Sequence, residues 1–233
     1  TIKVELKDLY LDPNNPRLAL PERPGYRNIG KLFDNENQKE IFKTVIEGNH
    51  DITTDGLVQT ILGVGWEDLA PIAVWQPDGI KDKYLVVEGN RRTTSLRYIH
   101  EVEYPKIKKK YDKAKVSTVP ATIQQLPEIE EEMKRAESVI NQTKIIHVKK
   151  MVAKTDEDLR EDLPKLLSII HLNGPKDWEP YAQSKFVFET YCNFWQDANG
   201  QITPTNNLTW EDNIERKTQN YCNIKTIRKC RET

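Results

Sequence analysis

The residue types best suited to chemistry lie together in the run Glu88-Gly89-Asn90-Arg91-Arg92-Thr93-Thr94-Ser95. An apolar stretch at 84–87 precedes this run and predicts a strand, while Leu96 and Ile99 follow it at helical spacing. A helix that starts directly after a strand presents unpaired backbone N–H groups and about half a positive charge at its N-terminus. Gly89 permits a close approach, and the two guanidinium groups add charge and paired donors. We therefore predict an anion site, with phosphate as its natural ligand.

Two common phosphate-binding motifs do not describe this run. The sequence contains neither the GxxxxGK[ST] pattern of P-loops nor the GxGxxG pattern of dinucleotide-binding folds. A structural interpretation stands beside the functional one: Arg91 and Arg92 form surface ion pairs on a capped helix, and Glu88 is a strand-end carboxylate paired with Arg92. The sequence leaves both interpretations open.

Several short elements must position the run. Residues 2–6 alternate apolar and charged side chains, which predicts a strand that ends near Asp12. The loop 12–17, Asp-Pro-Asn-Asn-Pro-Arg, must turn because its two prolines fix φ and remove two backbone donors. Periodicity predicts the other elements as helices at about 38–47 and 57–62 and strands at 71–75, 84–87 and 119–123, with a hairpin-like turn between the first two strands.

In the second half of the chain, the hydrophobic pattern predicts helices throughout. Apolar positions recur at helical spacing from Ile129 to Ile140, from Leu159 to Ile170, where Pro164 kinks or restarts the helix, and after Trp178. Glutamates before the first stripe, and lysines at 144, 149 and 150 after it, suit the helix dipole. Lysines 106 to 110 are interpreted as a solvated helix end or loop, or else as a phosphate contact.

These patterns predict an α+β protein with two domains. A small mixed-sheet domain covers residues 1–125, and an all-α helical domain covers residues 126–233, with the boundary at the change in composition near residue 125. Because the chain opens on Thr1 and closes directly after a periodic segment, we expect it to be trimmed from a longer protein.

Composition narrows the class of protein. The 35 basic and 36 acidic residues give a formal charge of −1, which excludes a globally basic protein that coats nucleic acid but allows a local basic patch. Mean hydropathy is −0.72, and no apolar run is long enough to span a bilayer, so we expect no membrane partner. The three cysteines, all from Cys192 onward, form neither a disulfide framework nor a zinc pattern, and a reducing cytoplasm fits best.

The final segment has the spacing of a helix-turn-helix. A capping pattern begins at Thr209, a turn is predicted at 220–223, and residues 213–231 carry six basic side chains against one acidic. This asymmetry suggests contact with duplex phosphates by a reading helix, through Lys225, Thr226, Arg228 and Lys229. A solvated basic helix end is the alternative.

Three short sequence motifs in the first half of the chain resemble motifs of the ParB N-terminal-like (ParB/sulfiredoxin) superfamily. Residues 87–96 resemble its G-[EN]-R-R-x-x-[AS]-L box, residues 12–17 its early N-P-x-N-P-R loop, and residues 55–74 its helix before a P-[IL]-x-V strand. A weaker match covers residues 170–178, similar to the R-H-[IL]-x-G...W segment of stand-alone members.

The resemblance implies a nucleotide site and a DNA connection. Carried over by position, the residues that would wrap the phosphates are Gly89, Asn90, Arg91, Arg92 and Thr93, with Arg17 approaching from the opposite loop. The implied ligand is a nucleoside triphosphate with Mg²⁺, either ATP or CTP, and members often form homodimers. The reactive cysteine of sulfiredoxins falls here on Asn90, so the redox branch does not apply.

The function predicted from the sequence is binding of a nucleoside triphosphate by a DNA-associated ParB-like protein, with slow Mg²⁺-dependent hydrolysis, in DNA segregation, transcription or phage defence. Glu88 and His171 are the candidate catalytic residues, although His171 also suits a helix cap or a core position, and no metal ligand is assigned. The alternatives are a non-enzymatic module that binds DNA or a partner, and a metal-dependent nuclease.

Overall fold

The computed structural model describes residues 1–15, 23–47, 55–67, 72–168 and 170. The chain divides into two compact units. The first contains residues 1–13, 28–76 and 80–151, and the second contains residues 14–27, 77–79 and the chain from Val152 onward.

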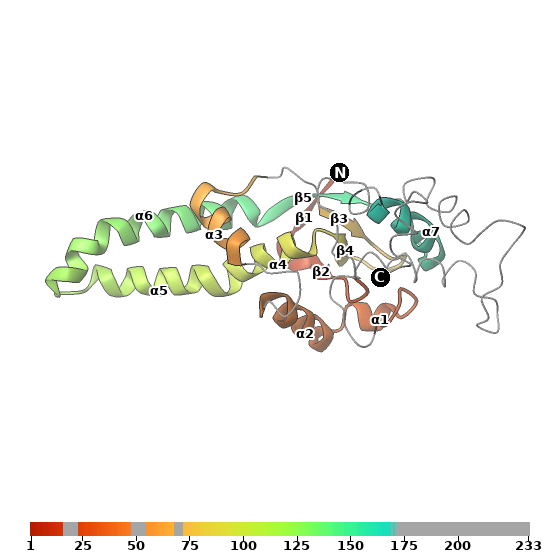
Figure 1. Cartoon of the computed structure of the whole chain (residues 1–233), viewed down its shortest axis with the longest axis horizontal. Helices are drawn as coiled ribbons and strands as arrows, with labels where there is room; N and C mark the ends of the chain where they lie inside the picture. Colours follow the sequence, from red (N-terminus) through yellow and green to blue (C-terminus); the bar gives the residue numbers. More distant parts are fainter. Residues whose placement is uncertain (16–22, 48–54, 68–71, 169, 171–233) are drawn as a thin grey trace, which may run out of the picture. The chain divides into compact units, whose positions relative to one another are not determined.

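A five-stranded mixed sheet forms the centre of the first unit, in the order β1-β5-β3-β4-β2 (Figure 1). The strands are β1 (Ile2–Glu5), β2 (Leu9–Leu11), β3 (Ile72–Trp75), β4 (Tyr84–Glu88) and β5 (Ile145–Lys150). β3 and β4 are antiparallel neighbours, as the predicted hairpin-like connection requires. β2 and β4 run parallel with Leu11 opposite Val86, so the loop after β2 starts beside the turn after β4.

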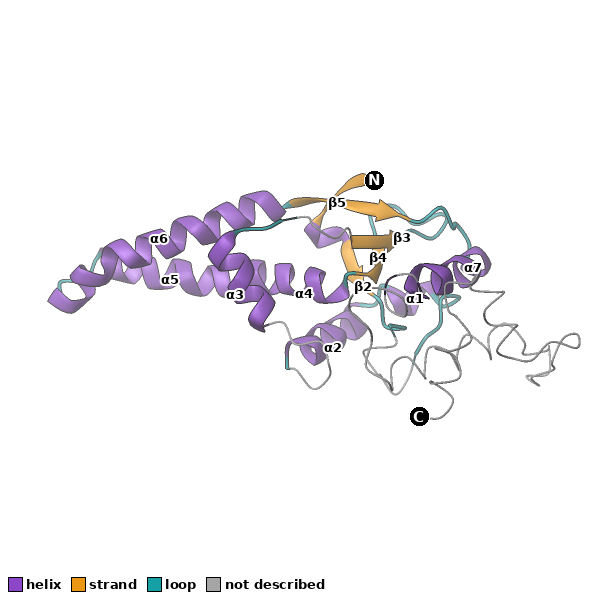
Figure 2. Ribbon diagram, turned by 45° about the horizontal axis from the view of Figure 1, so that its top comes forward, coloured by secondary structure: helices purple, strands orange, loops and turns teal. Residues whose placement is uncertain are grey.

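The described helices of the first unit are α1 (Ile29–Leu32), α2 (Asn35–Ile46), α3 (Asp55–Val64), α4 (Asn90–Tyr98), α5 (Tyr104–Lys115) and α6 (Pro120–Thr143), with a 3-10 turn η1 (Leu6–Asp8) and a π-helical turn η3 (Ile99–Glu103). Of these, α3, α4 and α6 share a hydrophobic core with the strands, and α5 extends away from the sheet (Figure 2). The core joins strand residues such as Val74 and Val86 to Ile61 of α3, Leu96 of α4 and Val139 of α6. Burial of these aliphatic side chains is the main stabilising contribution and fixes α4 against the sheet.

Helices α5 and α6 lie side by side as a hairpin (Figures 1 and 2). Ile107 of α5 packs with Met133 and Ala136 of α6 in a small cluster of its own. The four-residue connection 116–119 leaves Val116 and Val119 exposed at the end of the hairpin.

Two sequence predictions are wrong around this hairpin. Residues 119–123 do not form a strand but begin α6, with Pro120 in its first turn, where the missing proline N–H has no helical partner to lose. Residues 145–150 are not helical but form β5, whose Ile146 and Val148 are buried between exposed neighbours, the period of a half-buried strand. The predicted boundary at residue 125 falls inside α6, and the first unit extends to Met151.

The second unit contains α7 (Asp156–Leu167), which confirms the predicted leucine stripe and runs through Pro164 without a break. A capping box starts this helix: the Thr155 hydroxyl accepts from the Asp158 N–H at 3.1 Å, and the Asp158 carboxylate accepts from the Thr155 N–H at 3.3 Å. Arg27 donates to Asp156 at 3.1 Å and to Glu157 at 3.3 Å.

The described chain is therefore of mixed α/β class, as predicted in its broad outline. No helix within the described ranges is both long enough and apolar enough to cross a membrane. The predicted helix after Trp178 and the helix-turn-helix-like segment lie outside the described residues.

Candidate functional site

Gly89 forms the turn between β4 and α4. It adopts the left-handed conformation, with φ of 98° and ψ of 19°, and occupies the N-cap of α4 without any side chain to cap the helix. Because the first helical hydrogen bond runs from the Thr93 N–H to the Gly89 carbonyl, the N–H groups of residues 90–92 have no acceptor within the helix. The predicted strand-to-helix turn is confirmed, with its N–H groups at the position expected of an anion site.

The space around Gly89 is as restrictive as its backbone. A Cβ atom at this position would lie 3.0 Å from Cγ1 of Ile72, 3.3 Å from Cα of Ile72 and 3.3 Å from Nη2 of Arg92. Glycine is therefore required both for the positive φ and for the close packing of β3 against the turn.

Asn90 uses its side chain to join backbone segments. Its Oδ1 accepts a hydrogen bond from the Asp12 N–H at 3.0 Å, and its Nδ2 donates to the Val86 carbonyl at 2.8 Å. The residue is only 3% exposed. Any contact of Asn90 with an anion would consequently come from its backbone N–H, because the side chain is already hydrogen-bonded on both sides.

The two arginines provide donors that have no partner among the described residues. Nη2 of Arg92 lies 3.4 Å from Oε1 of Glu88, in a pair whose side chains are 22% and 15% exposed. This contact agrees with the structural interpretation of Glu88. Nε of Arg91 and Nη1 of Arg92 are buried, and neither has a hydrogen-bond partner in the part of the chain that the structure describes.

The hydroxyl groups in the first turns of α4 likewise differ in whether they have a hydrogen-bond partner among the described residues. The Ser95 hydroxyl donates to the Arg91 carbonyl at 3.0 Å, the usual local bond of a helical serine. The hydroxyls of Thr93 and Thr94 are fully buried, and neither makes such a bond nor has any other partner among the described residues.

Buried donors of this kind are groups that a bound ligand or water can satisfy. Leaving a buried donor unpaired costs about 1–3 kcal/mol, and more for a charged group, so native structures leave few of them. Two guanidinium donors of this kind, beside the N–H groups that a helix start leaves without an intrahelical acceptor, form an arrangement that an anion with several oxygen acceptors would satisfy.

Several predicted residues cannot be placed relative to this turn. Arg17, His171 and the predicted DNA-binding residues Lys225, Thr226, Arg228 and Lys229 lie outside the described residues. Within the described ranges, no three His, Cys, Asp or Glu side chains are grouped closely enough to hold a metal ion. The residues brought together are therefore Glu88, Gly89, Asn90, Arg91, Arg92 and Thr93.

The structure adds two residues to the site: Ile72 restricts Gly89, and Asp12 is hydrogen-bonded to Asn90. Thr94, which belongs to the run singled out in the sequence, carries a buried hydroxyl without a partner in the described chain. No sequence signal existed for the pairing of Asp12 with Asn90, which depends on the order of strands in the sheet.

Comparison with known proteins gives no match: no family model, no curated protein and no solved structure is significantly similar to this chain. The candidate site is accordingly defined by its geometry.

Proposed function

We propose that the turn from Glu88 to Thr93 binds the phosphates of a nucleoside triphosphate, and that the chain is a ParB-like nucleotide-binding protein that associates with DNA in the cytoplasm. The observation that supports this most directly is the pair of buried guanidinium donors, Nε of Arg91 and Nη1 of Arg92, which have no partner in the described chain. Their position in the first turn of α4 adds the helix dipole to their own charge.

A phosphate chain fits this donor set better than a single carboxylate would. The N–H groups of residues 90–92, which have no acceptor within the helix, two guanidinium donors and two threonine hydroxyls are more donors than two oxygens accept. A di- or triphosphate supplies several oxygens along an extended group, with negative charge on each phosphate. The proposal leaves the base open between ATP and CTP.

Magnesium fits the same proposal. Mg²⁺ keeps several waters and binds through one or two carboxylates together with substrate phosphates, so it does not need a cluster of three protein ligands. Glu88, beside the turn, is the described carboxylate best placed for such a role, and bound Mg²⁺ would neutralise charge on the phosphates during hydrolysis. Slow hydrolysis, with Glu88 and His171 as candidate catalytic residues, belongs to this proposal.

Association with DNA is proposed from the charge of the final segment, through Lys225, Thr226, Arg228 and Lys229. A homodimer belongs to the same proposal, since members of the resembling family often form one.

Calorimetric titration tests the nucleotide proposal directly. The chain is titrated with ATP, GTP, CTP and UTP, each with Mg²⁺ at physiological salt. We expect one of them to bind with micromolar affinity, and Arg91→Ala to abolish that binding. Arg135→Ala is the matched control, because it removes the same charge from an exposed position on α6.

The alternative candidate is a module whose arginine turn holds a phosphate of DNA. The same unpartnered donors suit a DNA phosphate. Failure of all four nucleotides to bind, together with duplex binding that Arg91→Ala weakens, would favour this module. Metal-dependent nicking lost in Glu88→Gln or His171→Ala would favour a nuclease.

A further inference from the structure

The hairpin of α5 and α6 carries a basic groove that shares no residue with the candidate phosphate-binding turn. Lys106, Lys109, Lys110 and Lys113 line it together with Ser117, Thr122 and Gln125, and its volume is about 550 Å³. Its two remaining lining residues, Ala114 and Ile129, are apolar, so no acidic side chain lines the groove. We call this feature the lysine groove.

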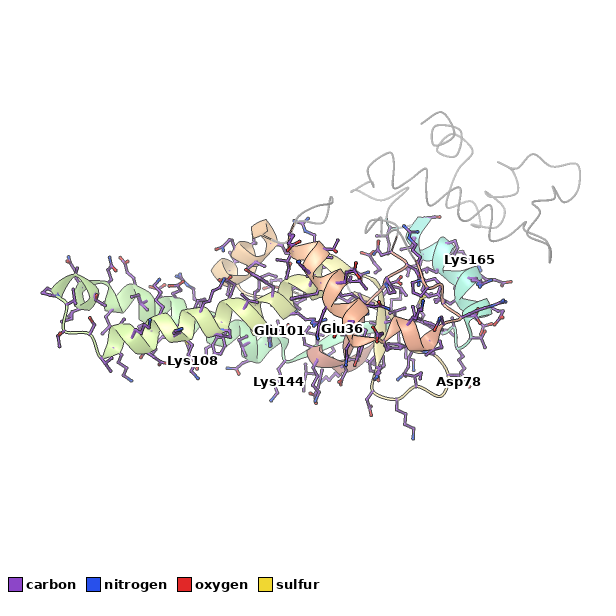
Figure 3. All side chains as sticks on the ribbon, turned by 90° about the horizontal axis from the view of Figure 1, so that it is seen from below. Glu36, Asp78, Glu101, Lys108, Lys144 and Lys165 are labelled. Carbon is purple, nitrogen blue, oxygen red and sulfur yellow. The ribbon has the colours of Figure 1, made fainter. Side chains whose placement is uncertain are left out.

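The spacing of the lysines places them in a row. Positions 106, 109, 110 and 113 follow the i, i+3, i+4, i+7 pattern, which lies along one face of a helix. At a rise of about 1.5 Å per residue the row is about 10.5 Å long. Lys108, on the same helix, does not line the groove and is labelled on the hairpin in Figure 3.

The described residues neutralise only part of this charge. Lys106 pairs with Glu103 at 2.8 Å, and Lys110 pairs with Glu132 at 2.7 Å. Lys109 and Lys113 have no carboxylate partner among the described residues. They are four residues apart on one helix face, where like charges repel each other.

An adjoining groove has mixed charge. Glu128 and Glu132 of α6 line it together with Arg135 and Lys110, and α3 closes its other side. Lys110, Gln125 and Ile129 line both grooves, whereas Lys106, Lys109 and Lys113 line the lysine groove alone. A concave surface lined by one sign of charge concentrates its field and attracts oppositely charged ligands.

We propose that the lysine groove binds the sugar-phosphate backbone of duplex DNA. Its charges are spread along a row instead of converging on one point, which suits a polyanion better than a single phosphate. A strand of DNA carries one charge per about 3.4 Å of helix axis, so the row spans about three phosphates. Ser117, Thr122 and Gln125 supply neutral donors of the kind that contact DNA phosphates and sugars.

A membrane surface fits the groove less well. Interfacial membrane binding needs a large apolar surface that enters the bilayer, whereas the lining of the groove is polar apart from Ala114 and Ile129. The inference uses neither the nucleotide site nor the final basic segment, so it stands or falls separately from the proposed function.

The test measures the affinity of the full chain for a short mixed-sequence duplex over a series of salt concentrations. Each phosphate contact contributes about 0.9 to the slope of log K against log salt. The double variant Lys109→Gln/Lys113→Gln is expected to lower that slope by about two. The control is Lys108→Gln/Lys144→Gln, which removes two exposed charges outside the groove, one on α5 and one at the C-cap of α6 (Figure 3).

Three results would overturn the inference: no duplex binding by the native chain, an unchanged slope in the groove variant, or an equal loss in the control variant. Binding to phosphatidylserine vesicles in place of duplex would overturn it in favour of a lipid ligand. Lys109→Arg/Lys113→Arg should retain the native slope, and thermal unfolding confirms that each variant folds. Nucleotide binding should be unchanged in the groove variant. Lys225→Gln/Arg228→Gln should lower the salt slope independently of the groove variant. A failure of the proposed function can therefore be distinguished from a failure of this inference.

Discussion

The side chain of Asn90 accepts a hydrogen bond from the backbone N–H of Asp12 at 3.0 Å, which joins two segments 78 residues apart. The same amide donates to the Val86 carbonyl at 2.8 Å. Asn90 therefore fixes the end of β2 to the end of β4, and it does so from the first position of the helix whose N-terminus forms the candidate phosphate site. A ligand-independent role explains why this position carries an amide, which can accept and donate at once.

Replacing Asn90 with alanine should destabilise the fold. Asn90→Ala leaves the Asp12 N–H and the Val86 carbonyl without their partners, at about 1–3 kcal/mol for each group that stays buried and unpaired. Urea denaturation of the apo protein measures the loss. Asn141→Ala, at an exposed position of α6, is the control and should change stability little. Equal stability of the two variants would contradict the structural role of Asn90.

Replacing Gly89 separates backbone strain from crowding. Gly89→Ala places an L-residue in the left-handed region, at about 1–2 kcal/mol, and also brings a Cβ to 3.0 Å from Ile72. Gly79 has a similar φ of 78°, but a Cβ there meets nothing within 4 Å. Gly89→Ala should therefore lower the free energy of unfolding more than Gly79→Ala does. Equal losses in urea denaturation would show that the contact with Ile72 is unimportant.

Local patterns predicted the elements around the site correctly. The apolar runs of β3 and β4, the turn between them and the helix after Gly89 all have a period or a breaker within a few residues, so the sequence alone identifies them. The same reasoning failed at Val119–Ile123, where β-branched residues favour a strand but Pro120 fits the first turn of a helix equally well. It also failed at β5, whose short alternation followed a long helical stripe.

The sequence alone did not predict which strands pair over long range. Ile2 lies opposite Val148, and this pairing inserts β5 between β1 and β3, which no local period can indicate. The contact of Asp12 with Asn90 depends on that sheet order too. Lysines 106 to 110 were considered as one group, whereas the helix divides them, because Lys108 faces away from the groove and Lys113 joins it. Residue types thus indicated the chemistry of each site, but the fold determined which residues share it.

The imidazole of His100 should make stability depend on pH. Thr143 donates its hydroxyl proton to the Val139 carbonyl at 2.7 Å, so it accepts from Nε2 of His100, also at 2.7 Å. Burial lowers the pKa of His100 below its ordinary value of 6.5, while the nearby Glu101 raises it slightly. The unfolded chain therefore binds the proton more readily than the folded chain, and the contribution of His100 is fully present above pH 6.5 and decreases as the pH falls towards its folded pKa.

The variant His100→Gln has no proton to gain in this range. Native protein should lose stability relative to His100→Gln as the pH is lowered from about 7.5 to about 5.5, before most carboxylates titrate. Urea denaturation of both proteins across this range measures the difference. A constant difference would contradict the lowered pKa, because it would mean that folded and unfolded chains protonate His100 alike.

Arg91 should contribute to ligand binding and not to the stability of the apo protein. Its buried Nε has no partner in the described chain, so Arg91→Met, which keeps an apolar stem and removes the donors, should leave the apo melting temperature unchanged or higher. Nucleotide at about 100 times its dissociation constant should stabilise the native protein by about 2.7 kcal/mol and the variant by nothing. Arg135→Met, on exposed α6, should retain the full ligand effect. A variant that melts much earlier yet still gains stability from nucleotide would show that Arg91 is structural, and the phosphate site would then have to lie elsewhere.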